Sequence, residues 1–293
     1  MSLLPQNTFW RQDVALDVGT ATIRVATGMH RLIEQTSGTV ANRALCGGVV
    51  VDVEVFVAIL KPLLAKVRAF GIVKPRVLAC APSDVKRSER ELLVDSILRS
   101  GALSVVVIPE PIAAAVGGGI DVSSPHAQMV IDIGEGVTDC AVIRSSKINT
   151  TCAVRIGCAA MRREIVLAAE RDGKPTITDE EAEELMRSYG VVRSGVSGQS
   201  SVGAEQSAYA MEPVVAKLIG TVNSFLREMP HDLGCEIIES GIWLTGGGAL
   251  IPGIRERLED QTGIEVAIVG NPRRAVVEGA RVILPVVAAL NRW

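Results

Sequence analysis

The chain has 293 residues, of which 48% are hydrophobic, and its formal net charge is −3. This length and composition allow a sizeable core and two compact domains, and they exclude an intrinsically disordered chain. The small negative charge and the aromatic content of 3% argue against nucleic-acid binding through electrostatic attraction or base stacking.

The chain begins with a leader of about twelve residues that contains the apolar side chains of Leu3, Leu4, Phe9 and Trp10. A Trp next to Arg11 suits a bilayer interface, so one interpretation is a shallow membrane anchor at the inner face of the plasma membrane. The alternative is a tail that packs on its own domain or lies loose. The sequence shows no signal peptide and no long uncharged apolar span, so we expect a cytoplasmic location.

Residues 14–27 predict a strand, a glycine turn and a second strand. An apolar run ends in Asp17, and Gly19, Thr20 and Ala21 follow. Such a turn exposes backbone N–H groups, and glycine lets a phosphate approach them closely. A carboxylate at the strand end could hold Mg²⁺, directly or through water. An ordinary hairpin is the alternative for a single motif of this kind.

The next segment alternates between predicted strands and helices. Residues 28–42 are polar and show no pattern, whereas residues 53–70 predict an apolar-rich helix that is kinked or restarted at Pro62. Residues 76–81 and 105–108 predict strands, and residues 82–100 predict an amphipathic helix between them. A helix then begins near Glu110, with Pro111 in its first turn. Glu110 is either a favourable charge at this N-terminus or a base that orients water.

Residues 129–143 repeat the pattern of the first hairpin. Asp132 aligns with Asp17, and Gly134 aligns with Gly19, with Glu135 and Gly136 completing the second turn. Two such hairpins more than a hundred residues apart indicate an internal duplication. We expect its two halves to grip one polyphosphate.

The remaining chain predicts a strand at 151–156 and a loop at 193–207. It also predicts three helices, one at 157–170, one that begins near 178 and one at 208–228. A third glycine-rich stretch at 241–253 predicts a strand, a glycine turn and a helix. Its three consecutive glycines, Gly246, Gly247 and Gly248, are better explained by a ligand that approaches closely than by a plain turn. A strand at 264–269 and a helix at 275–290 close the chain.

Cysteine and histidine spacings argue against a metal centre or a disulfide framework. The six cysteines form no CxxC pair, and we expect buried free thiols. We expect the three histidines, His30, His126 and His231, on the surface.

The three glycine turns contain neither a Walker A loop nor a complete Rossmann fingerprint. Together they resemble the actin-like ATPase superfamily and, within it, the bacterial MreB/Mbl family. The likeness rests on motifs that span most of the chain in family order: ALDVGTA at 15–21, GVVVD at 48–52, RVLACAP at 76–82, EPIAAAVG at 110–117, VIDIGEG at 130–136, VRIG at 154–157 and LTGGGAL at 244–250.

The resemblance implies an α/β, actin-like (ribonuclease H-like) duplicated fold whose two domains flank a nucleotide cleft. The expected domains are 1–120 with 275–293, and 121–274, each with a reduced small subdomain. It implies ATP and Mg²⁺, with the metal held through water by two carboxylates and with a third as the water-orienting base. The residues that match the family's site are Asp17, Gly19, Thr20, Ala21, Glu110, Asp132, Gly134, Glu135, Gly136, Gly246, Gly247 and Gly248.

The sequence also departs from the family. Two regions, residues 28–42 and the region around 171–208, are shorter than the corresponding regions of the family. Glu135 stands where the family usually has Gly. Cys158 and Ala159 stand where the family usually has Gly and Asp. A Lys and a Glu that contact adenosine in the family would align near Met186 and Ser188. We therefore expect the phosphate side of the site to be better preserved than the nucleoside side.

Three functions follow from the resemblance. The leading one is an MreB/Mbl-like protein that hydrolyses ATP slowly and assembles head to tail into filaments for cell-shape, cell-wall or spore-wall synthesis, with morphogenesis proteins as partners. The alternative is a nonpolymerising actin-fold adaptor that binds a partner peptide, as pilus-assembly and microcompartment relatives do. A small-molecule kinase is the third, and no substrate-domain motif supports it.

Overall fold

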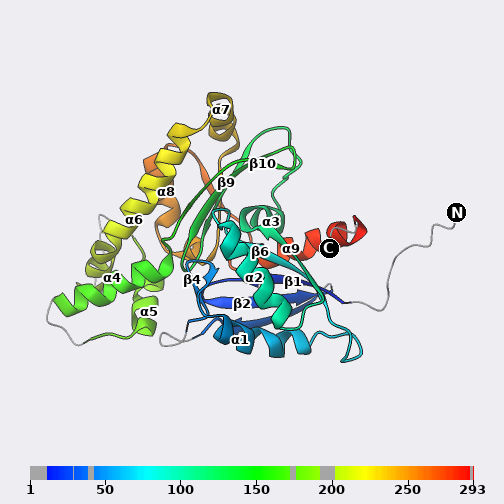
Figure 1. The fold of residues 1–293 in the computed structure, drawn as a ribbon. Coiled ribbons are helices and arrows are strands. Elements are labelled where there is room, and N and C mark those ends of the chain that lie inside the picture. Colours follow the sequence, from blue (N-terminus) through cyan, green and yellow to red (C-terminus); the bar gives the residue numbers. More distant parts are fainter. Residues whose placement is uncertain (1–11, 29, 39–42, 172–175, 192–201, 291–292) are drawn as a thin grey trace. The chain divides into compact units, whose positions relative to one another are not determined.

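The computed structural model describes residues 12–28, 30–38, 43–171, 176–191, 202–290 and 293 (Figure 1). The chain forms two compact units. The first comprises Met1–Ala81, Val85–Ile108 and Ala280–Trp293, and the second comprises Pro82–Asp84 and Pro109–Gly279. These units and the expected domains divide the chain at different residues, and the expected domain boundaries stay a prediction.

The first unit is built on a five-stranded sheet in the order β3-β2-β1-β6-β7. Strand β1 pairs antiparallel with β2 and parallel with β6. A two-stranded hairpin, β4–β5, stands apart from this sheet. The strands are β1 (Asp13–Val18), β2 (Thr22–Thr27), β3 (Arg31–Thr36), β4 (Leu45–Cys46), β5 (Val49–Val50), β6 (Arg76–Ala81) and β7 (Ser104–Pro109).

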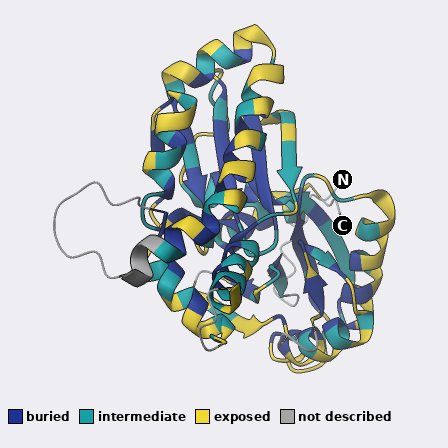
Figure 2. Ribbon diagram, turned by 90° about the vertical axis from the view of Figure 1, so that its left-hand side faces the viewer, coloured by how far each residue is buried: buried dark blue, intermediate teal, exposed yellow. Residues whose placement is uncertain are grey.

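Helices α1 (Val53–Ala65) and α2 (Arg87–Arg99) bury apolar side chains in the core of the first unit. Side chains alternate along a strand, so Val14 and Leu16 of β1 point into this core, whereas Asp17 belongs to the opposite face. Figure 2 shows the buried strands in dark blue and the exposed sides of the helices in yellow.

The second unit repeats this sheet, in the order β10-β9-β8-β11-β12. Strand β8 pairs antiparallel with β9 and parallel with β11, as β1 does with β2 and β6. The same alternation turns Met129, Ile131 and Ile133 into the core and Asp132 to the other face. The strands are β8 (Gln128–Ile133), β9 (Thr138–Arg144), β10 (Lys147–Val154), β11 (Ile242–Thr245) and β12 (Val266–Ile268).

Helices of the second unit cover its sheet, and the long helix α6 runs beside α8 (Figure 1). The helices are α3 (Glu110–Gly117), α4 (Cys158–Arg171), α5 (Asp179–Tyr189), α6 (Val202–Glu228), α7 (His231–Ser240), the 3₁₀ helix η1 (Gly247–Leu250), α8 (Ile254–Thr262) and α9 (Ala275–Ala289). Helix α9 begins in the second unit, and its residues from Ala280 onward belong to the first. The shared strand order of the two sheets confirms the predicted internal duplication.

Several elements differ from the expectation. Strand β3 lies within the stretch that shows no pattern, and β4, β5 and α7 were not predicted from the sequence. The predicted helix 53–70 is too long, since α1 passes through Pro62 and ends at Ala65. After it, Phe70 and Gly71 adopt positive φ of 54° and 74° in a tight turn that a helix cannot contain. Similarly, α2 begins at Arg87 rather than near residue 82.

Within the described residues, no helix has the length and apolar character that crossing a membrane requires. The leader residues Leu3, Leu4, Phe9 and Trp10 lie outside the described part of the chain, so their membrane contact stays a prediction. Most of the predicted loop at 193–207 also falls outside it. Where the described part resumes, residues 202–207 belong to α6.

Candidate functional site

The first phosphate-type hairpin has the predicted form, with Asp17 near the end of β1 and the turn at Gly19 (Figure 1). Asp17 is 5% exposed and lies opposite Arg24 of β2. The Nη1 atom of Arg24 donates to Oδ2 of Asp17 at 3.0 Å, and its Nε donates to Glu34 at 2.9 Å. Burial raises the pKa of the Asp17 carboxyl, and the charge and hydrogen bond of Arg24 oppose this rise.

The turn after Asp17 leaves no room for a side chain at its glycine. A Cβ atom on Gly19 would lie 2.7 Å from the carbonyl oxygen of Thr22. The turn is also held from outside, because the Ser37 hydroxyl donates to the Gly19 carbonyl at 2.5 Å and the Gly48 N–H donates to the Thr20 hydroxyl at 2.9 Å. Ser37 and Gly48 therefore brace the first turn.

The second hairpin reproduces the geometry of the first. A Cβ atom on Gly134 would lie 2.9 Å from the carbonyl oxygen of Val137, and Asp132, which is 7% exposed, is near the end of β8. This turn rests on the start of α4, where the N–H groups of Cys158 and Ala159 donate to the carbonyls of Gly134 and Glu135 at 3.1 and 2.9 Å. A side chain at Gly157 would strike the same carbonyls, at 2.5 and 2.6 Å.

The third glycine turn packs directly on the second hairpin. A Cβ atom on Gly246 would lie 2.2 Å from Oδ1 of Asp132, and one on Gly248 would lie 2.1 Å from the Ile133 side chain. Gly246 also has φ of 82°, which favours glycine. The structure thus brings Asp132, the turn 134–136 and the turn 246–248 together within the second unit.

Glu110 is the first residue of α3, also in the second unit, and it is 7% exposed. Pro109 is the N-cap and Pro111 lies in the first turn, as predicted. Helix α3 packs against β8 and β9, the two strands of the second hairpin. The structure therefore places Glu110 on an element that contacts this hairpin, which suits either of its two expected roles.

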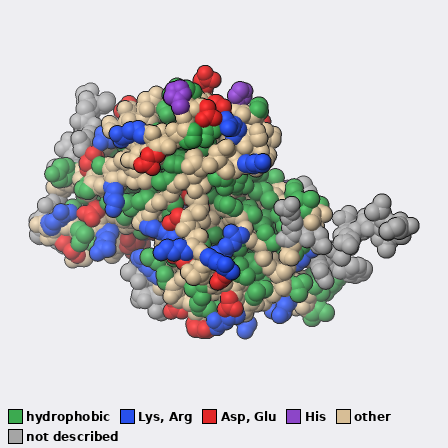
Figure 3. Space-filling model, turned by 45° about the horizontal axis from the view of Figure 1, so that its top comes forward, with side chains coloured by type: hydrophobic (Ala, Val, Ile, Leu, Met, Phe, Trp, Pro, Cys, Tyr) green, Lys and Arg blue, Asp and Glu red, His purple; other side chains and the backbone are tan. Residues whose placement is uncertain are grey.

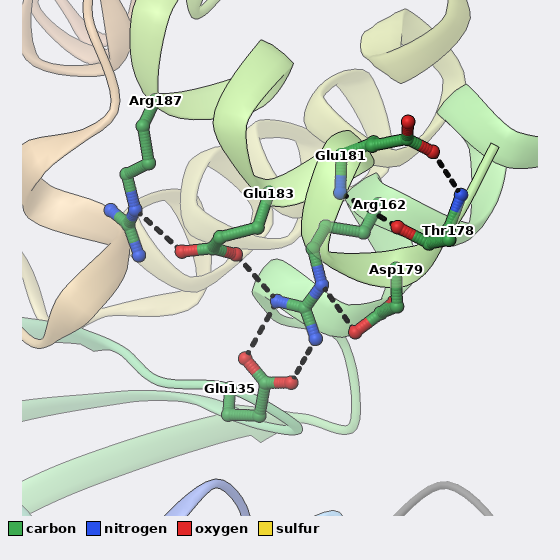
Figure 4. A network of polar contacts seen from close by, with 7 residues as sticks. All are labelled: Glu135, Arg162, Thr178, Asp179, Glu181, Glu183 and Arg187. Atoms are coloured by element: carbon green, nitrogen blue, oxygen red, sulfur yellow. Dashed lines mark hydrogen bonds and ion pairs between the residues drawn. The ribbon is translucent and has the colours of Figure 1, made fainter.

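A network of charged side chains links the second and third turns, and sequence reasoning missed it (Figure 4). The Arg162 guanidinium of α4 binds both carboxylate oxygens of Glu135, as well as Asp179 at 3.1 Å and Glu183 at 2.8 Å. Glu183 also accepts from Arg187 at 2.7 Å. The Nη1 atom of Arg187 donates to the carbonyl of Gly247 at 2.6 Å.

Two signals in the sequence pointed to this network. An acid in a phosphate loop, Glu135, requires a cationic partner if the loop is to accept an anion. Glu183 and Arg187 have the four-residue spacing of a helical ion pair. Burial alone lowers the pKa of the Arg162 guanidinium, but the hydrogen bonds and charge of Glu135, followed by those of Asp179, raise it, so Arg162 stays charged.

The expected alignment of nucleoside contacts near Met186 and Ser188 stays a prediction. The Met186 side chain is fully buried in the core of the second unit, and Ser188 is exposed. Arg187 is the residue of α5 that contacts the third glycine turn, through the Gly247 carbonyl. Helix α5 begins with a capping box, in which Thr178 and Glu181 form reciprocal hydrogen bonds (Figure 4).

The cysteines are free, and the prediction that they are buried holds for Cys80, Cys140 and Cys158 but not for Cys46 and Cys235, which are exposed. Burial raises the pKa of the Cys158 thiol to about 12, so this thiol is inert. The three histidines are exposed, as predicted. In the described ranges, no three His, Cys, Asp or Glu side chains are grouped so that they could hold a metal ion.

Acidic and basic side chains are interspersed on the face shown in Figure 3.

A model of one protein family, described as MreB/Mbl protein, matches residues 14–292. This chain belongs to the MreB/Mbl family. It is 31% identical over 290 residues to the cell shape-determining protein Mbl of Bacillus subtilis, covering 92% of this chain and 87% of that protein. This match and the duplicated fold establish an MreB-like actin homologue, which confirms the family resemblance.

Solved structures support the fold of this MreB/Mbl-family protein. The crystal structure of MreB5 of Spiroplasma citri bound to AMPPNP matches with a TM-score of 0.87 and 23% identity, covering 96% of this chain and 98% of that one. A MamK double helical filament matches with a TM-score of 0.77 and 16% identity, covering 95% and 99%. At these identities, the matches confirm the expected actin-like α/β fold.

Proposed function

We propose that this MreB/Mbl-family protein binds Mg-ATP through its two phosphate-type hairpins and hydrolyses it slowly. In this proposal the turns bind the phosphates, and the third glycine turn lies beside the adenosine. The nucleotide-binding residues are Asp17, Gly19, Thr20, Ala21, Asp132, Gly134, Glu135, Gly136, Gly246, Gly247 and Gly248. Glu110 orients the attacking water.

The observation that carries this proposal is the duplicated turn. Gly19 and Gly134 occupy equivalent positions, each next to a backbone carbonyl that excludes a Cβ atom and each two residues after a buried aspartate. Turns of this kind present backbone N–H groups to an anion at close range. A single hairpin would be an unremarkable turn, but the same construction in both halves supports a shared polyphosphate. The AMPPNP complex of the similar MreB5 supports the same ligand class.

The acidic residues fit a hydrated Mg²⁺ rather than a metal held only by protein. Mg²⁺ usually keeps several waters and binds one or two carboxylates together with substrate phosphates. Asp17 and Asp132 supply one carboxylate each. Arg24 holds Oδ2 of Asp17, while Oδ1 lies 3.8 Å from where a Gly19 Cβ would be, on the side of the turn. When bound, the ion would neutralise phosphate charge, the main requirement of phosphoryl transfer.

We further propose that the protein assembles head to tail into filaments and acts in cell shape or wall synthesis with morphogenesis proteins, at the inner face of the plasma membrane. The curated relative Mbl, a cell shape-determining protein, supports this role, and the filament of the similar MamK supports self-assembly. The leader residues carry the proposed membrane contact.

The ATP proposal is tested by titration calorimetry and phosphate release on three variants. We expect Asp17→Ala and Asp132→Ala each to weaken Mg-ATP binding by about a hundredfold or more, since each removes a carboxylate from the metal. Glu110→Ala should keep binding and slow hydrolysis by about a hundredfold, the usual contribution of a positioned base. The matched control is Asp95→Ala, on the exposed side of α2.

Thermal unfolding of each variant separates a lost ligand from a lost fold. If Asp17→Ala and Asp132→Ala remain folded and bind Mg-ATP as the parent does, the proposed site is wrong. Hydrolysis at the parent rate by Glu110→Ala would overturn the role of Glu110 alone.

A further inference from the structure

The acid in the second phosphate loop creates an electrostatic problem for an anionic ligand. Glu135 lies between Gly134 and Gly136, where the proposed function places the phosphates, and its negative charge would repel them. The inference that follows rests on this proposed function. We propose that Arg162 is the positioning residue that makes the second loop fit to bind phosphate, and that Glu183 and Arg187 extend its hold to the third glycine turn.

The contact between Arg162 and Glu135 is of the strongest kind available to a side-chain pair. Two nitrogens of the guanidinium face the two carboxylate oxygens, with Nη1 to Oε2 at 3.0 Å (Figure 4). The Arg162 side chain is 9% exposed and that of Glu135 is 20% exposed, so water screens the pair poorly. This pair turns the Glu135 carboxylate toward α4 and cancels its charge.

Arg162 is shared among more acids than it can neutralise alone. Glu135, Asp179 and Glu183 all bind it, and Arg187 is the second cation of the network. Three carboxylates thus face two guanidiniums, so the network carries an excess of one negative charge. Removing Arg162 would leave three acids facing one cation next to the proposed phosphate loop.

The network also fixes the distance between the second and third turns. From Glu135 it passes through Arg162 and Glu183 to Arg187, which binds the Gly247 carbonyl. On the other side, Gly246 and Gly248 pack on Asp132 and Ile133 without room for a side chain. The two turns are therefore tied together twice, by backbone packing and by the ion-pair chain. In the proposed site these turns face the phosphates and the adenosine.

The charge argument predicts that affinity depends on the number of phosphates. Calorimetric titrations of ATP, ADP and AMP would compare the parent with Arg162→Gln, Glu135→Gln and the double variant. We expect Arg162→Gln to weaken ATP binding about tenfold or more, ADP less and AMP least, because the uncovered acids repel each phosphate. Glu135→Gln should bind ATP a few times more tightly than the parent, and the double variant should recover most of the affinity.

Arg187 provides a separate readout at the other end of the network. Arg187→Gln frees the Gly247 carbonyl but leaves the Arg162–Glu135 pair, so we expect ATP binding to weaken by a larger factor than the binding of inorganic tripolyphosphate. Arg162→Gln should weaken both. The matched control is Arg255→Gln, because Arg255 is also paired with two acids, Glu256 and Glu259, on α8. It should change neither ligand's affinity.

The outcomes separate this inference from the function on which it rests. If the parent binds ATP but Arg162→Gln loses ATP, ADP and AMP affinity by the same factor, and Glu135→Gln does not restore it, Arg162 has only a structural role and the inference is overturned. If Arg162→Gln does not fold, weaker ATP binding by Glu135→Gln overturns it equally. A parent protein that binds no nucleotide would overturn the proposed function and the inference together.

Discussion

At the scale of single residues, Asp139 shows what burial does to a carboxylate in this fold. It lies on β9 and is 1% exposed. The Ser83 N–H donates to Oδ2 at 2.6 Å, and the Ser83 hydroxyl donates to Oδ1. Burial raises the pKa of the Asp139 carboxyl from 3.8 to about 6, although the hydrogen bonds from Ser83 lower it. The nearby charges of Asp84 and Arg155 oppose each other.

This pKa predicts how Asp139 affects stability at different pH. The folded state keeps the proton up to about pH 6, whereas the unfolded chain loses it near pH 4. The stabilisation by the protonated form is therefore complete below pH 4 and is lost as the pH rises through 6. We expect Asp139→Asn, which remains neutral and can keep both contacts with Ser83, to be about 1–3 kcal/mol more stable than the parent at pH 8.

Urea unfolding at pH 4.5 and pH 8, without nucleotide, measures this difference. At pH 4.5 the gain should fall to about a third of its value at pH 8, because the folded parent is then protonated but the unfolded chain has already lost most of its proton. Asp260→Asn, on the exposed side of α8, is the control and should show no gain at either pH. An equal gain of Asp139→Asn at both pH values would contradict the assigned pKa.

Residue identities in the site were predicted from the sequence only where chain-local patterns reveal them. Asp17 and Asp132 stand out because each ends an apolar run before a glycine turn. Arg162 does not, because its role depends on the way α4 and α5 meet the turn at Glu135.

At the scale of elements, α3 and α9 show how glycine permits close packing. A Cβ atom on Gly117 would lie 1.8 Å from the carbonyl oxygen of Ala275, and one on Gly279 would lie 1.7 Å from that of Ala113. The two helices therefore touch backbone to backbone. Neither sequence pattern predicts this crossing, because both glycines look like weak positions in apolar helices.

We predict that Gly117→Ala and Gly279→Ala each destabilise the protein by about 2 kcal/mol or more, because an added methyl group must push the helices apart. Urea unfolding gives the free energy of unfolding. The matched control is Gly220→Ala on α6, where nothing lies within 4 Å of the new Cβ atom. That exposed helical position should instead gain about 1 kcal/mol. Equal effects at the three sites would show that propensity alone decides.

Sequence patterns predicted the positions of buried strands better than those of strands at the edge of a sheet. Strands β1, β6, β8 and β11 contain mostly buried residues and read as apolar runs. Strand β3 lies at the sheet edge, and its residues are half-buried or exposed, so it carries no apolar run. Its register is set by pairing with β2 rather than by a core, which is information that the local sequence lacks.

At the scale of the whole molecule, the property to test is the assembly of several copies of the protein into filaments. We predict that the protein pellets in an ultracentrifuge above a critical concentration with Mg-ATP, and less with Mg-ADP or no nucleotide. The reason is that a head-to-tail contact does not close and so propagates. Asp132→Ala is the control for nucleotide dependence, and phosphate release is followed in the same tubes.

A stable monomer at every concentration, with no phosphate release, would contradict the filament proposal and favour the nonpolymerising adaptor that binds a partner peptide. The sequence could establish the duplication because it repeats its own hairpin. It could not establish assembly, since that depends on surfaces between copies rather than on patterns within one.

One arginine of the first unit contacts both the start of β1 and the last residue of the chain. Arg76 of β6 binds Asp13 at the start of β1 at 2.6 Å, and its guanidinium lies 4.3 Å from the ring centre of Trp293. The first unit thus needs the final residues of the chain, whereas the second is almost continuous in sequence. During synthesis on the ribosome, the last residue of the second unit is added before the last residues of the first. We therefore expect the second unit to fold no later than the first, in contrast to the usual order in which the N-terminal part of a protein folds first.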